Sequence, residues 1–135
     1  MGYRTYIDTG VLITALRGSK DAADRALSYL NDPLRDYITS DYVKVELLPK
    51  CRYHKNTLEE QFYEDFFRRS TILVPSSDDL LALAIDIGGH TGISGMDAIH
   101  VACAVAAQAQ ELITGEKLTK PIHRANGVVV ISVNP

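Results

Sequence analysis

The chain has few cysteines, and neither is placed for a metal or redox motif. Its 135 residues include only Cys51 and Cys103, and no Cys-x-x-Cys spacing occurs. Zinc sites and disulfide frameworks both need several cysteines at defined spacings, so the sequence indicates neither. Both cysteines fall in expected helices, and we expect Cys103 to behave as a small buried apolar residue.

A long apolar run is also missing. The longest is the Ala-rich segment 98–107, which contains His100 and is too short to span a bilayer. The first four residues are too few and too polar for a signal peptide, and Asp8 interrupts the apolar run that follows. We therefore expect a cytoplasmic protein with no membrane association.

The sequence carries no excess of positive charge. Its net charge is −3, which argues against a general nucleic-acid coat. A nuclease stays compatible with this value, because a carboxylate site lowers the net charge while the binding surface is locally basic. Hydrophobic residues make up 46% and charged residues 23%, so we expect one globular domain over residues 1–135.

Short strands are expected to alternate with helices along the chain. The strand segments are 3–8, 37–39, 72–74, 111–114 and 128–133, and the main helical segments are 9–16, 20–30, 41 onward, 57–69, 78–87 and 95–108. This order predicts an α/β fold, a three-layer α/β/α sandwich around a short, mostly parallel sheet of about five strands. Three local expectations follow. Pro49 is expected to kink or restart the helix that begins at residue 41, and Thr57 is expected to cap the helix that runs to about residue 69. Gly88-Gly89 is expected to end the helix over 78–87.

Four acidic residues lie at or inside apolar stretches, where packing gives no reason for a charge. They are Asp8, Glu46, Asp97 and Glu116. Asp8 and Glu116 fall at or just after strand ends, where parallel sheets bind their ligands. If the fold brings the four together, the carboxylates need a cation to stay ionised side by side, and oxygen ligands select Mg²⁺ or Mn²⁺.

Each acid also has a structural interpretation. Asp8 is an ordinary helix N-cap, and Ser94-x-x-Asp97 forms the pattern of a capping box. Glu46 is placed to pair with Lys50 four residues later, and Glu116 is compatible with a plain turn. Four separate structural roles in this order are less probable than one shared site.

The ordered set of motifs resembles the PIN-domain ribonucleases. Tyr6-Ile7-Asp8-Thr9-Gly10 resembles their opening, and the stretch from Ser40 to Glu46-Leu47 their second acidic motif. Asp97-Ala98-Ile99-His100-Val101-Ala102 resembles the third, and Thr114-Gly115-Glu116 the last, which usually reads Thr-x-Asp. The similarity spans nearly the whole chain.

The resemblance implies a Mg²⁺- or Mn²⁺-dependent endoribonuclease of the VapC toxin kind, usually a homodimer held inactive by a small protein antitoxin. Asp8 and Asp97 would be the main metal ligands. Glu46 and Glu116 would act through waters or orient the nucleophile, and Thr9 and Thr114 would support them.

Glu116 departs from the family pattern, because its side chain is one methylene longer than Asp. A catalytically weak or inactive module that binds RNA or protein is therefore the alternative. A phosphatase of the haloacid-dehalogenase kind ranks lower, since Gly10 stands where that chemistry wants a second Asp.

Several other polar residues are candidates for roles around such a site. We expect His100 to be a structural histidine hydrogen-bonded near it, and Lys117 to be the best single phosphate contact. Further candidates for an RNA surface are the aromatic and basic residues Tyr42, Lys44, Lys50, Arg52, Tyr53, His54, Lys55, Arg68, Arg69, Lys120, His123 and Arg124.

Overall fold

A computed structural model describes residues 2–135 and contains a five-stranded, wholly parallel sheet. The strand order is β3-β2-β1-β4-β5, so the N-terminal strand lies in the middle. The strands are β1 (Tyr3–Ile7), β2 (Arg35–Ser40), β3 (Ile72–Val74), β4 (Glu111–Thr114) and β5 (Val129–Ser132). Each expected strand is confirmed, with differences of one or two residues at the ends.

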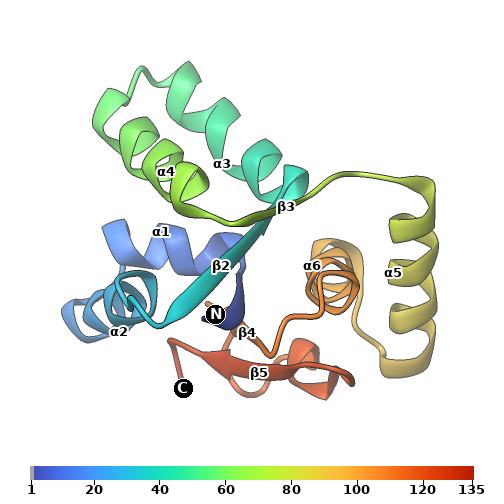
Figure 1. Ribbon diagram of the computed structural model, residues 1–135. Helices are drawn as coiled ribbons and strands as arrows, with labels where there is room; N and C mark the ends of the chain where they lie inside the picture. Colours follow the sequence, from blue (N-terminus) through green and yellow to red (C-terminus); the bar gives the residue numbers. More distant parts are fainter. Residues whose placement is uncertain (1) are drawn as a thin grey trace.

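Six α-helices cover the two faces of the sheet (Figure 1). Those on one side are α1 (Thr9–Arg17), α2 (Lys20–Leu30), α3 (Asp41–Tyr53) and α4 (Thr57–Arg69), and those on the other are α5 (Asp78–Thr91) and α6 (Gly95–Ala106). A short 3₁₀ helix, η1 (Pro121–Arg124), precedes β5. The predicted three-layer sandwich is therefore confirmed, and no helix in residues 2–135 is long and apolar enough to cross a membrane.

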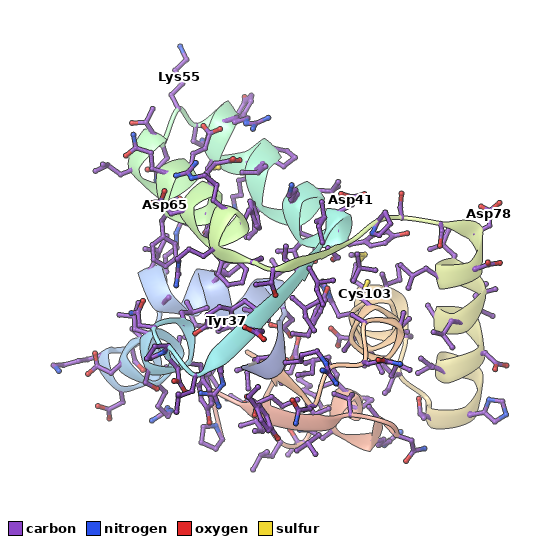
Figure 2. All side chains as sticks on the ribbon, in the orientation of Figure 1. Tyr37, Asp41, Lys55, Asp65, Asp78 and Cys103 are labelled. Atoms are coloured by element: carbon purple, nitrogen blue, oxygen red, sulfur yellow. The ribbon has the colours of Figure 1, made fainter. Side chains whose placement is uncertain are left out.

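The core forms where the central strands meet the helices on both faces. Strands β1 and β4 place Tyr6, Ile7, Leu112 and Ile113 there with no solvent exposure. Runs of consecutive buried residues in these strands fit a sheet that is covered on both sides. Helix α6 is buried nearly all round, and Cys103 within it is an inaccessible free thiol, as expected. In Figure 2 Cys103 lies on α6 in the molecular interior.

Three local expectations need correction. Helix α3 continues through Pro49 to Tyr53 instead of restarting, because the lost backbone donor and the ring fall on an exposed part of the helix. Helix α4 is capped by Asn56, whose side chain accepts from the Glu59 amide, while Thr57 is its first residue. Helix α5 passes through Gly88-Gly89 and ends at Gly92.

Gly92 adopts the left-handed conformation, with φ of 80°, and its amide donates to the Gly88 carbonyl. Only glycine adopts that conformation without a steric penalty, so it stops the helix. Gly88 and Gly89 have ordinary helical geometry, and a helix tolerates such glycines at a modest entropic cost.

Candidate active site

The four acids identified in the sequence line one pocket of about 380 Å³ at the carboxyl edge of the sheet. Asp8 follows β1 and Glu116 follows β4, which are neighbours in the sheet. Glu46 comes from α3, and Asp97 from the first turn of α6. The remaining lining residues are Thr9, Gly10, Ile13, Thr14, His100 and Gly115.

Two glycines allow the segments carrying Asp8 and Glu116 to approach. A Cβ on Gly115 would lie 3.1–3.2 Å from the backbone of Gly10, tighter than side chains normally pack. Neither glycine was among the residues predicted for the site. Their position beside two of the acids was the available signal, since a backbone approach this close is a recurrent reason for glycine.

Asp8 is buried, and two backbone amides hold its carboxylate. Its Oδ1 accepts hydrogen bonds from the amides of Val11, at 3.2 Å, and Gly115, at 3.3 Å. The first is an N-cap bond to α1, so the structural interpretation of Asp8 is correct. The second ties the same oxygen to the loop after β4, so the carboxylate joins two walls of the pocket. Burial raises the pKa of Asp8, although His100, Thr114 and the two amides oppose that rise.

Asp97 lies at the N-terminus of α6 without a local partner to explain it. Ser94 is the N-cap residue, but its side chain makes no capping hydrogen bond. The capping-box interpretation of Asp97 therefore lacks the hydrogen bond that the Ser94 side chain should accept. Burial raises the pKa of Asp97, and repulsion from Glu116 and Glu46 raises it further.

Glu46 is turned toward a histidine and a threonine. Its Oε1 accepts from the Thr9 hydroxyl at 2.6 Å and lies 2.7 Å from Nε2 of His100. Burial alone would raise the pKa of Glu46, but these two hydrogen bonds outweigh it and lower the pKa. The suggested pair with Lys50 is absent from the ion pairs of residues 2–135, so that alternative is wrong.

His100 is a buried member of the site, as expected for a structural histidine beside it. One ring nitrogen contacts Glu46, and the other lies 2.8 Å from the Tyr6 hydroxyl. Tyr6 was not predicted as a polar partner, because it is one of several large residues in a buried strand.

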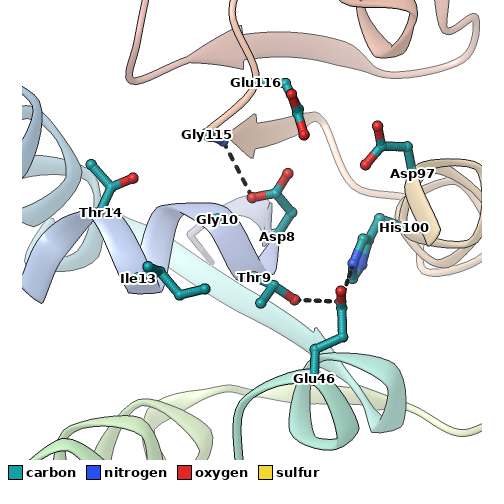
Figure 3. Close-up of a pocket in the computed structure, with 10 residues that line it drawn as sticks. All are labelled: Asp8, Thr9, Gly10, Ile13, Thr14, Glu46, Asp97, His100, Gly115 and Glu116. Atoms are coloured by element: carbon teal, nitrogen blue, oxygen red, sulfur yellow. Dashed lines mark hydrogen bonds and ion pairs between the residues drawn. The ribbon is translucent and has the colours of Figure 1, made fainter. Parts of the chain in front are cut away.

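In Figure 3, Asp8, Asp97 and Glu116 surround one side of the pocket, while Glu46 points to His100 and Thr9. Across residues 2–135, no group of three or more His, Cys, Asp or Glu side chains is close enough to hold a metal ion as the side chains stand. The backbone thus brings the four acids to one pocket, but their carboxylate groups do not converge on one shared position.

Most of the basic candidates lie away from this pocket or have other partners. Arg52 pairs with Glu60 and Glu64, Arg68 pairs with Asp65, and Lys44 stacks on the Phe67 ring. Lys55 projects from the far end of the α3–α4 hairpin (Figure 2). By contrast, Lys117 is exposed and adjacent to Glu116, and Lys120 is near enough to lower the pKa of Asp97.

Comparison with known proteins identifies the family. The PIN domain model matches residues 5–120, which is most of the chain. The chain belongs to the PIN domain family. No curated protein matches it significantly.

Solved structures of the same fold include three proteins from different organisms. VapBC2 from Rickettsia felis, bound to a promoter DNA fragment, has a TM-score of 0.70 and 17% identity over 96% of this chain and 98% of that one. A toxin–antitoxin complex from Klebsiella pneumoniae has a TM-score of 0.67 and 23% identity, with coverages of 93% and 95%. FitAcB from Neisseria gonorrhoeae has a TM-score of 0.73 and 18% identity, with coverages of 96% and 97%. At these identities the likeness shows the fold.

Proposed function

We propose that this PIN-domain protein is a divalent-metal-dependent endoribonuclease that hydrolyses RNA phosphodiester bonds. The observation that carries the proposal is the meeting of four carboxylates, from residues 8 to 116, in one pocket. Membership of a family of nucleases supports it, and displaces the haloacid-dehalogenase alternative.

The residues present fit Mg²⁺ or Mn²⁺ by their donor chemistry. All four are carboxylates, the ligands that hard divalent ions prefer. The elevated pKa of Asp97 reflects burial and neighbouring negative charge, which a cation would offset. Asp8 and Asp97 would hold the ion, with Glu46 and Glu116 contributing through waters. When bound, it would supply positive charge for the phosphate and the leaving oxygen and lower the pKa of a bound water.

The chain itself orients the groups that face the substrate. The Val11 and Gly115 amides fix the Asp8 carboxylate, so its position does not depend on a flexible side chain. Thr9 and His100 both bond to Oε1 of Glu46, and Oε2 is the oxygen left to orient a water. Glu116, one methylene longer than Asp, reaches into the pocket from a loop.

We propose that the RNA backbone crosses the pocket beside Lys117 and Lys120. Both side chains are exposed on the segment that follows Glu116. Phosphates that approach a carboxylate cluster need a flanking positive charge, and neither lysine forms an ion pair within the described part of the chain.

The test is cleavage of a mixed RNA panel by the purified protein with Mg²⁺, with Mn²⁺ or with EDTA. Wild type is run beside Asp97→Asn and the control Asp86→Asn, which changes an acid on α5 that is 74% exposed and outside the pocket. We expect cleavage that needs a divalent ion, is lost in Asp97→Asn and is retained in Asp86→Asn. Equal cleavage by all three would overturn the site assignment.

The protein's partners form the second part of the proposal. We propose that it is the toxin of a toxin–antitoxin pair, a homodimer held inactive by a small protein antitoxin. The support is fold similarity to a protein solved in a toxin–antitoxin complex from Klebsiella pneumoniae. Light scattering of the purified chain checks the dimer. Inhibition of RNA cleavage by the product of an adjacent small gene checks the antitoxin.

One observation favours a second candidate, a module that binds RNA without cutting it. Glu46 is held by His100 and Thr9, apart from the other three acids, and residue 116 is Glu where the family usually has Asp. On that hypothesis the panel above would show bound but intact RNA with every metal.

A further inference from the structure

A line of buried hydrogen bonds leads from the protein core to the pocket. The Tyr6 hydroxyl lies 2.9 Å from Oγ of Ser40 and 2.8 Å from Nδ1 of His100. On the other side of the ring, His100 Nε2 lies 2.7 Å from Oε1 of Glu46. Tyr6 and Ser40 are fully buried and His100 is 2% exposed, so water is excluded as far as the ring, while the Glu46 end opens to the pocket.

The groups on the two sides of the imidazole ring together favour one direction for these bonds. An ionised carboxylate only accepts hydrogen bonds, which favours a proton on Nε2 of His100, and a hydroxyl that donates to Nδ1 favours the same neutral tautomer. In a neutral imidazole the other nitrogen, Nδ1, then accepts, and Tyr6 is its donor. The Tyr6 oxygen in turn accepts from Ser40, whose own oxygen accepts from the Val43 amide as the N-cap of α3.

The surroundings of Tyr6 support this direction. Burial raises the pKa of Tyr6 well above its ordinary value, so the hydroxyl keeps the proton that it donates. The neighbouring Cys103 thiol also stays protonated, since burial raises its pKa to about 11. The phenol and the thiol behind His100 therefore both stay neutral.

We propose that Tyr6 and Ser40 are positioning residues of the site, which select the Nε2–H form of His100 and through it hold Glu46 in place. The role in catalysis rests on the proposed nuclease function, whereas the tautomer of His100 does not. Neither residue touches the pocket; both act through the imidazole ring.

Tyr63 is a buried tyrosine with a structural role, and it provides a comparison for Tyr6. It is 1% exposed, and its hydroxyl donates to Glu59 at 2.6 Å, one turn earlier on α4. That bond ends within α4, whereas the bonds of Tyr6 join β1, α3 and α6 and end at a pocket carboxylate. Tyr63→Phe is therefore the matched control for Tyr6→Phe.

Removing the Tyr6 hydroxyl should loosen Glu46 while leaving the packing intact. In Tyr6→Phe, Nδ1 of His100 loses its donor, so the preference for the Nε2–H tautomer weakens. Partners that orient a metal-ligating side chain typically contribute about 10–100-fold to metal affinity or activity. We expect a loss of that size in Mn²⁺ affinity, measured by calorimetry, with Tyr63→Phe close to wild type.

The deciding experiment is ¹⁵N NMR of the histidine side chains in the metal-free, full-length protein. We expect wild-type His100 to show a protonated Nε2 and an unprotonated, hydrogen-bonded Nδ1. Tyr6→Phe should shift the tautomer population, and Tyr63→Phe should not. A wild-type ring protonated on Nδ1, or a Tyr6→Phe spectrum identical to that of the control, would overturn the proposal.

A second pair of variants covers the case in which Tyr6→Phe does not fold. Ser40→Ala removes the first donor of the line together with a helix cap, and Ser77→Ala removes only the equivalent cap of α5. We expect the His100 spectrum to change in the first variant alone; a change in both or in neither contradicts the inference. Because no RNA cleavage is measured, these outcomes hold even if the protein proves not to be a nuclease.

Discussion

Asp97 illustrates a carboxyl group whose surroundings favour its neutral form. Burial and the charges of Glu116 and Glu46 raise its pKa, so the ionised group destabilises the metal-free fold at neutral pH. We predict that Asp97→Asn raises the melting temperature of the metal-free protein, by roughly 3–5 °C for each kcal/mol of repulsion relieved. Calorimetry at neutral pH checks this against Asp86→Asn, and a lower melting temperature in Asp97→Asn would contradict it.

Asp8 combines a helix cap with a site carboxylate, and two substitutions separate these functions. Asn keeps an oxygen that can accept from the Val11 amide, so Asp8→Asn should fold with little loss of stability. Asp8→Ala removes the cap as well and should cost about 1 kcal/mol more in the free energy of unfolding. Both should abolish metal-dependent RNA cleavage. Cleavage retained by Asp8→Asn alone would reduce the role of Asp8 to capping.

At the scale of whole elements, two glycines of helix α5 have opposite expected effects. Gly92 needs a positive φ, and a Cβ there would lie 2.9 Å from the Arg124 side chain. We predict that Gly92→Ala lowers the free energy of unfolding by about 1–2 kcal/mol. Gly89 is helical with open space at its Cβ position, so Gly89→Ala should raise it by about 0.5–1 kcal/mol. Chemical denaturation measures both, and equal effects would contradict this account of the helix end.

The same helix shows what sequence patterns predict well and what they do not. Apolar periodicity gave each strand and helix, because burial of one face determines which elements form. Helix ends depend on the backbone conformation of single residues. The consecutive glycines Gly88 and Gly89 therefore predicted the end of α5, whereas the helix ends at the left-handed Gly92. Likewise Pro49 stays inside α3, because its ring and its missing backbone donor fall on an exposed part of the helix.

The candidate site was predictable in its acids and less so in their partners. Strand order puts Asp8 and Glu116 on one edge, a consequence of the α/β pattern alone. The contact of Glu46 with His100 joins residues 54 apart, and the line behind it reaches back to Tyr6. Pairings of this range depend on how the helices pack, which no local pattern encodes.

Within the molecule as a whole, Asp8 and Asp97 should each oppose folding more strongly as the pH rises through the acidic range when no metal is bound. Asp8 and Asp97 have pKa values raised from an ordinary 3.8, so the native state binds their protons more tightly than the unfolded chain. The destabilisation by these two carboxylates is absent below pH 3.8 and complete above their raised native-state pKa values. Glu46, with a lowered pKa, contributes in the opposite sense. Asp97→Asn should reduce this loss of unfolding free energy with rising pH. Unfolding curves across the acidic pH range would measure the difference.

A divalent ion should reverse this loss at neutral pH. An ion that binds only the native state stabilises it by about 2.7 kcal/mol at a hundred times its dissociation constant. We predict that Mn²⁺ raises the melting temperature of wild type and that EDTA removes the gain. In Asp97→Asn the same addition should have little effect. An equal rise in both would place the ion elsewhere.

The sheet order determines when the pocket can first form. The central strand β1 is synthesised before its neighbour β4 and before the acid that follows β4. Until the β4 segment has left the ribosome, Asp8 has no β4 loop to bond to and the pocket has no fourth wall. The four acids therefore come together only after residue 116 has emerged, and a function that needs all four cannot begin before then.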